Sequence, residues 1–168
     1  MTTTLLWQPG GGFGPFRIGV PASQIRDAVS GNWEVRQLRT PPVAMRSVMV
    51  EHSVWLDHFL TLYTGETGLT TLVTFQRQSL SLKYQSYDLW SPTTIRELHE
   101  AGYLVVTQED DYEYYFQIDE LNIGWGFNDE GELKGVGCTS KKWDECELAR
   151  GVSYRPVNSN DWKFILGQ

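Results

Sequence analysis

The chain has 168 residues, of which 40% are hydrophobic and 13% aromatic. This length fits one domain or two small repeats that share a core. The net charge of −7 argues against nucleic acid as a direct partner, because phosphates are bound by Lys and Arg. No run approaches 18 apolar residues, and the start of the chain lacks the pattern of a secretory signal, so we expect a cytoplasmic protein with no membrane partner.

The first half of the chain predicts a helix followed by hairpins. Residues 1–14 are rich in glycine and predict a flexible lead-in. Pro21 and Ser23 precede apolar residues at helical spacing, which indicates a helix that Gly31 ends. The turn at 64–68 holds Gly65 and Gly68, which can adopt positive φ. Strands are expected at 33–38, 47–55, 58–63, 69–76 and 80–84.

The second half repeats this order. Ser91-Pro92 opens a helix that ends near Gly102. The turn at 128–131 carries Gly131, which follows Gly68 by 63 positions, and an Ile-Arg-acid triplet recurs after 70. Strands are expected at 103–108, 112–118, 120–127 and 132–138.

These elements predict an α+β fold: one antiparallel sheet with short helices on one face. We expect a single domain over 15–168, with tandem helix-plus-hairpin repeats at 15–86 and 87–142. In the tail, 143–168, residues 144–149 could form a helical turn and 162–166 a last strand or a docked terminus.

Patterns of catalytic or cofactor chemistry are weak. Gly10–Gly14 is no phosphate loop, since no Lys-Ser/Thr pair follows it. His52 and His58 would share one face of an extended strand, but no third ligand completes a metal site. Cys138 and Cys146 are expected to be free thiols. We predict no cofactor, no metal and no catalytic residue, although a hydrolase with paired carboxylates stays open because acids are abundant.

The most unusual feature is the segment from Glu97 to Leu133, which holds eleven carboxylates and no Lys or Arg. The rest of the chain, with 14 bases against 10 acids, sums to +4. Aromatic residues lie among the acids, and such a segment can present a negative field to a basic partner. The residues expected to contact that partner are Glu109, Asp110, Asp111, Glu113, Tyr115 and Trp125.

The segments Phe16-Arg17-Ile18-Gly19 and Ser23-Gln24-Ile25-Arg26, with their echo at Ser91–Leu98, carry a resemblance. The chain resembles the β-lactamase inhibitory protein family, whose members have two helix-plus-sheet repeats. It also resembles small immunity proteins of bacterial polymorphic-toxin and contact-dependent inhibition systems. The resemblance implies a non-enzymatic protein that neutralises a cognate toxin, which we expect to be basic. The alternative is a small-ligand binding domain whose concave sheet is lined by Trp33, Trp55, Trp90 and Trp125.

Overall fold

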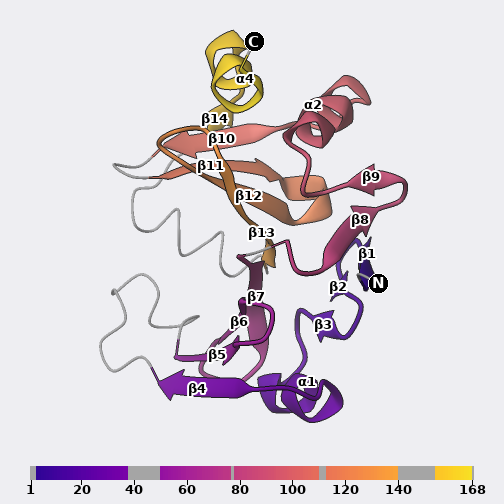
Figure 1. Cartoon of the computed structure of the whole chain (residues 1–168), viewed down its shortest axis with the longest axis vertical. Helices are drawn as coiled ribbons and strands as arrows, with labels where there is room; N and C mark the ends of the chain where they lie inside the picture. Colours follow the sequence, from indigo (N-terminus) through magenta and orange to yellow (C-terminus); the bar gives the residue numbers. More distant parts are fainter. Residues whose placement is uncertain (1–2, 38–49, 77, 110–112, 140–153, 168) are drawn as a thin grey trace.

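The computed structural model describes residues 3–37, 50–76, 78–109, 113–139 and 154–167. They form an α+β fold with two sheets and short helices (Figure 1). No described helix has the length and apolarity needed to cross a membrane.

The larger sheet has nine strands, and all of its pairs are antiparallel. Their order in space is β14-β10-β11-β12-β13-β7-β6-β5-β4, so β7 and β13 join the two halves of the chain. The first half contributes β4 (Trp33–Gln37), β5 (Glu51–Trp55), β6 (Leu60–Thr64) and β7 (Thr70–Phe75). The second half contributes β10 (Val106–Glu109), β11 (Glu113–Ile118), β12 (Ile123–Asn128), β13 (Leu133–Thr139) and β14 (Arg155–Pro156). The predicted strands of both halves are confirmed, with ends that shift by a few residues.

The expectation of a single sheet and of a flexible lead-in at 1–14 is wrong. A second sheet, of order β3-β2-β1-β8-β9, includes one parallel pair, β1 with β8. Trp7 and Phe13 of the supposed lead-in are buried, and their rings lie 4.8 Å apart. Apolar burial therefore outweighs the glycine content of this segment. The strands are β1 (Thr4–Gln8), β2 (Gly12–Phe13), β3 (Phe16–Arg17), β8 (Ser81–Tyr84) and β9 (Tyr87–Asp88).

The helices are short, and their packing residues belong to the same core as the inward side of the nine-stranded sheet. The described helices are α1 (Ala22–Ala28), α2 (Pro92–Glu100), α4 (Ser159–Leu166) and a 3-10 turn, η2 (Asp119–Leu121). The predictions of α1 and α2 are confirmed. Residues 162–166, expected as a strand or a docked terminus, instead belong to helix α4, and residues 144–149 lie outside the described residues.

Helix α4 is fixed at its start by a capping box between Asn158 and Asp161. Arg155 also donates two hydrogen bonds to the Asp161 carboxylate, at 2.7 and 2.8 Å. Burial favours a higher pKa for Asp161, but the bonds from Arg155 and from the Asn158 N–H, with the charge of Arg155, lower it overall. The cap thus couples the start of α4 to the neighbouring strand β14.

The two halves of the larger sheet have the same registers. Each residue of β5, β6 and β7 has its counterpart 63 positions later in β11, β12 and β13. The β-bulge recurs at the same place, at Tyr63/Thr64 and at Gly126/Phe127. Matching pairs are Trp55–Leu60 with Ile118–Ile123, and Leu62–Val73 with Trp125–Val136.

A further match precedes the helices. Phe13 pairs with Phe16 across the β2–β3 hairpin, and Tyr84 pairs with Tyr87 across β8–β9, 71 positions later. A repeat boundary between 86 and 87 therefore cuts a hairpin, and the matching segment of the second half begins at β8.

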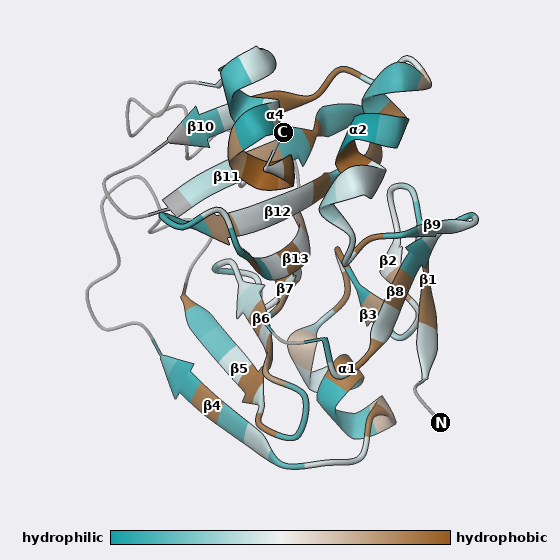
Figure 2. Ribbon diagram, turned by 45° about the horizontal axis from the view of Figure 1, so that its top comes forward, coloured by the Kyte–Doolittle hydropathy of each residue, from teal (hydrophilic) through white to brown (hydrophobic). Residues whose placement is uncertain are grey.

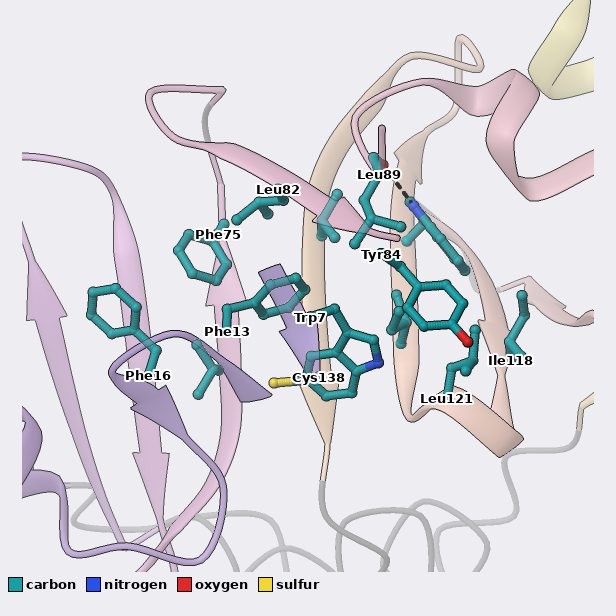
Figure 3. Packing of buried hydrophobic residues seen from close by; sticks show 14 of the residues in the cluster. Trp7, Phe13, Phe16, Phe75, Leu82, Tyr84, Leu89, Ile118, Leu121 and Cys138 are labelled. Carbon is teal, nitrogen blue, oxygen red and sulfur yellow. Dashed lines mark hydrogen bonds between the residues drawn. The ribbon is translucent and has the colours of Figure 1, made fainter. Parts of the chain in front are cut away.

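The core fills the space between the two sheets (Figure 3). Phe13 meets Phe75 edge to face at 5.4 Å, which joins the small sheet to β7. Cys138 is a free thiol in this core, and burial raises its pKa. The thiol is therefore neutral and inert at physiological pH.

Candidate binding face

The nine-stranded sheet has an inner face on the core and an outer face on the opposite side. In β12, for example, Ile123, Trp125 and Phe127 are buried, whereas the residues between them face outward. Neighbouring strands continue the pattern through their registers. The central part of the outer face carries His52, Val54, Thr61, Tyr63, Leu72, Thr74, Tyr115, Gln117, Gly124, Gly126, Gly135 and Gly137.

Tyr115, a predicted contact, does lie on this outer face. It is half-buried and stands opposite Gly126 of β12. A Cβ placed on Gly126 would lie 3.7 Å from the Tyr115 ring, so the ring lies beside the glycine backbone.

His52 and Tyr63 occupy the matching place in the first half; the sequence interpretation considered His52 only as a metal ligand and missed Tyr63. Their rings meet edge to face with centroids 5.8 Å apart, and burial raises the pKa of Tyr63. His52 is the counterpart of Tyr115, and Tyr63 is the counterpart of Gly126. The 63-residue spacing of the turn glycines was the signal that could have found this pair.

Steric crowding between β7 and β13 explains why glycines stand where the two halves of the sheet meet. A Cβ on Gly137 would lie 2.7 Å from the Val73 carbonyl oxygen, and one on Gly135 would lie 3.3 Å from that of Phe75. A side chain at Gly137 would therefore force strands β7 and β13 apart, whereas one at Gly135 would need only a small shift. Gly124 has more room, with its nearest neighbour at 3.7 Å.

Acidic residues gather at one end of the sheet. Glu113 starts β11 and pairs with Asn128, which ends β12, so β11 begins beside the β12–β13 turn. That turn carries Asp129 and Glu130, both exposed. Glu109, the last residue of β10, is one pair away, opposite Tyr114. Asp110 and Asp111 lie outside the described residues.

Glu132 belongs to the same end, but it already has partners. It meets Lys134 Nζ at 2.9 Å and accepts a bond from Asn128. The Lys134 ammonium, followed by the Asn128 amide, lowers the pKa of Glu132. Within this turn, the negative charge that has no ion-pair partner among the described residues therefore comes from Asp129 and Glu130.

The remaining acids of the segment lie elsewhere. Asp119 and Glu120 form the turn between β11 and β12, at the opposite end of these strands. Glu97 and Glu100 are on α2, where Glu100 pairs with Arg96 at 3.3 Å. The acidic segment therefore forms separate groups of acids, of which one lies beside the predicted contacts.

The prediction that Trp125 contacts a partner is wrong. It is 1% exposed on the inner face, and its indole N–H donates to the Leu89 carbonyl at 2.8 Å, the dashed line in Figure 3. Strand alternation places it inward because its neighbours at 124 and 126 face out. It cannot contact a partner without unfolding the core.

The four tryptophans of the ligand-pocket alternative do not line one concavity. Trp33 stacks on Trp55 at 5.8 Å on the inner face of the first half, and Trp125 is buried in the second. Trp90 donates its indole N–H to the Leu80 carbonyl. An open hollow of about 340 Å³ is instead lined by α2 and the end of α4, with Thr93, Arg96, Glu97, Glu100 and Leu166 around it.

The three histidines lie in separate elements. His52 is in β5, whereas His58 is in the turn after it, packed on Trp55 and in contact with Ser79 Oγ at 3.1 Å. His99 in α2 packs on Trp162. The described residues contain no cluster of three or more His, Cys, Asp or Glu that could hold a metal ion. Cys146 lies outside the described residues.

Searches of protein-family models, of curated proteins and of solved structures found no match to this chain.

Proposed function

We propose that the chain is a non-enzymatic immunity protein that binds a cognate bacterial toxin through the outer face and its acidic end. The observation that carries the proposal is the position of Tyr115. It lies on the outer face, in the strand that begins at Glu113 beside the exposed Asp129 and Glu130. Tyrosine is favoured at the centre of protein interfaces, and carboxylates near it accelerate encounter with a basic partner.

The acidic end is suited to attract a partner. Asp129 and Glu130 are exposed, and neither has an ion-pair partner within the described part of the chain. Exposed charges of one sign raise association rates with an oppositely charged protein. Toxin domains that act on nucleic acid carry basic surfaces, so a negative face complements them.

The shape of the outer face favours a protein over a small ligand. Its middle carries the glycines of β12 and β13 with Leu72 and Thr74 of β7, and Tyr115 and Tyr63 lie in the strands on either side. A small ligand needs a concave site that covers most of its surface, whereas a protein can bind a broad face. The open hollow described above lies on the helices, away from this face.

We also propose that the two halves derive from one duplicated unit, since registers, bulge and hairpins recur at nearly constant spacing. A toxin that acts inside the cell would be neutralised there, so we place the protein in the cytoplasm. It would act without a cofactor, by covering the toxin.

The proposal predicts that a toxin domain is encoded beside this gene, and the test uses that domain. Co-expression should protect cells from that domain, and the purified pair should form a complex. The double variant Asp129→Lys/Glu130→Lys should slow association roughly tenfold and weaken its salt dependence. Asp110→Lys/Asp111→Lys should act in the same direction.

The matched control is Asp119→Lys/Glu120→Lys. It changes the net charge by the same amount at the opposite end of the strands, and it should associate nearly as fast as the wild type. Equal rates for all three variants would remove the acidic end from the interface. Failure to protect against the neighbouring toxin would overturn the immunity function itself.

A further inference from the structure

The two edges of the nine-stranded sheet differ. One edge is β14, which has two residues and ends in Pro156, a residue with no N–H to donate. The other edge is β4, which has five residues and pairs with β5 on one side only (Figures 1 and 2). No described strand pairs with its other side. Proteins usually block such an edge, because it can pair with another strand.

The register of β4 shows which backbone groups face this edge. Leu56 N–H donates to the Asn32 carbonyl at 2.9 Å, and the pairing continues as Glu34 with Val54 and Arg36 with His52. Antiparallel pairs alternate between bonded and non-bonded, so the residues between these point their N–H and C=O groups away from β5. The edge thus offers the backbone groups of Trp33, Val35 and Gln37.

The charged side chains of β4 can form ion pairs with those of a second, antiparallel copy of the same strand. Glu34 and Arg36 both lie on the outer side and meet at 2.7 Å, with side chains 41% and 60% exposed. Val35 between them is 48% exposed on the other side. An antiparallel copy of this strand, centred on Val35, would place each glutamate opposite an arginine.

We propose that two copies of this chain associate through β4, in an antiparallel pairing about a two-fold axis at Val35. Glu34 then faces Arg36 of the partner subunit, and Arg36 faces Glu34 of the partner subunit. All three outward backbone positions find partners at the same time. Such isologous contacts are the common form of homodimer.

The contact is small, so the dimer is weak. Five residues from each copy bury less than the area of a standard stable interface. We expect a monomer–dimer equilibrium in the micromolar range or above, visible by sedimentation velocity across a concentration series. The dimer contact uses the edge strand β4, whereas the proposed toxin contact centres on β11 and the β12–β13 turn, so self-association and toxin binding are separate properties.

Charge reversal gives the sharpest test. Glu34→Arg and Arg36→Glu, each alone, place like charges opposite each other in the homodimer and should weaken it roughly tenfold. An equimolar mixture of the two variants restores both opposite-charge pairs and should form a heterodimer. The double variant Glu34→Arg/Arg36→Glu should self-associate like the wild type.

A backbone variant tests the hydrogen bonds. Val35→Pro removes an N–H that faces the open edge and leaves the β5 ladder intact, so it should abolish dimers while the monomer still folds. Thermal unfolding checks the fold of every variant. A wild type that stays monomeric at all concentrations, mixed charge variants that do not associate, or a Val35→Pro variant that dimerises normally would each overturn the proposal.

Discussion

The two halves of the nine-stranded sheet share one backbone and carry different surfaces. On the outer face, each half has four positions on its central hairpin at matching register. The first half fills them with Thr61, Tyr63, Leu72 and Thr74, and the second half has Gly124, Gly126, Gly135 and Gly137. Hydrogen-bonding and turns fix the registers, while outward side chains can vary at little cost to the fold. Function is therefore to be sought where the halves differ.

The inner faces differ as well. Near the start of β5, Arg26 of α1 bonds Glu51 at 3.0 Å and also contacts Ser53. The counterparts of these two β5 residues are Tyr114, on which Phe164 of α4 packs at 4.3 Å, and Phe116, which is buried. At this edge of the core, the first half thus has a polar cluster of Arg26, Glu51 and Ser53, whereas the second half is covered by helix α4.

The largest expected loss of stability distinguishes a buried core residue, Trp125, from a residue of the outer face, Tyr115. Trp125→Ala should destabilise the protein by about 3–5 kcal/mol, because it empties a large buried site. Trp125→Phe, which loses the bond to Leu89 and part of the buried ring volume, should cost about 1–2 kcal/mol. Tyr115→Ala on the adjacent outer face should cost less than Trp125→Ala. Denaturant unfolding measures all three, and a Trp125→Ala variant of normal stability would contradict the inward placement.

The next effect tests why the glycines of the second half are there. Gly137→Thr installs the residue of its counterpart, Thr74, but its Cβ would collide with the Val73 carbonyl. We expect a loss of about 1–3 kcal/mol from the forced backbone shift. Gly124→Thr installs the counterpart Thr61 where there is room, and should be neutral or stabilising by up to about 1 kcal/mol. Equal losses in urea unfolding would show that the junction is not the cause.

A smaller difference is expected between the ion pairs of the two helices. Glu51→Gln leaves Arg26, whose side chain is mostly buried, without its charged partner and should cost about 1 kcal/mol. Glu100→Gln breaks an exposed pair with Arg96, the counterpart of Arg26, and should cost less than about 0.5 kcal/mol. Thermal unfolding at low and high salt compares them. A larger loss of stability for Glu100→Gln than for Glu51→Gln would contradict the conclusion that the Arg26–Glu51 pair is the stronger one.

Sequence periodicity was sufficient to predict the hairpins, because apolar and polar residues alternate in strands with one buried face and glycines mark their turns. It failed at residues 1–14, where glycines concealed Trp7 and Phe13 as core residues. It also failed at Trp125, since an aromatic residue in a strand is equally suited to a core and to an interface until its face is known. The grouping of acids by strand end required the registers, which connect residues far apart in the chain.

The smallest expected effect is at the turn between β5 and β6. Phe59 has φ +48, a conformation unusual for a bulky residue, and its counterpart Asn122 has φ +52. Both carbonyls accept an N–H from the neighbouring strand, from Gln76 at 3.0 Å and from Thr139 at 3.3 Å. Because asparagine tolerates this conformation better, Phe59→Asn should stabilise the protein by about 0.5 kcal/mol after the lost ring contacts are subtracted.

The reciprocal change, Asn122→Phe, is the control for the Phe59 variant. It should cost about 1 kcal/mol, because it places a bulky residue in the left-handed conformation without the ring contacts of the first half. Chemical denaturation of both variants measures the difference. If Phe59→Asn instead destabilises the protein, then the partly exposed Phe59 ring contributes more through its contacts than its backbone strain costs. That outcome would make this turn, like the outer face, a place where the first half carries larger side chains than the second half.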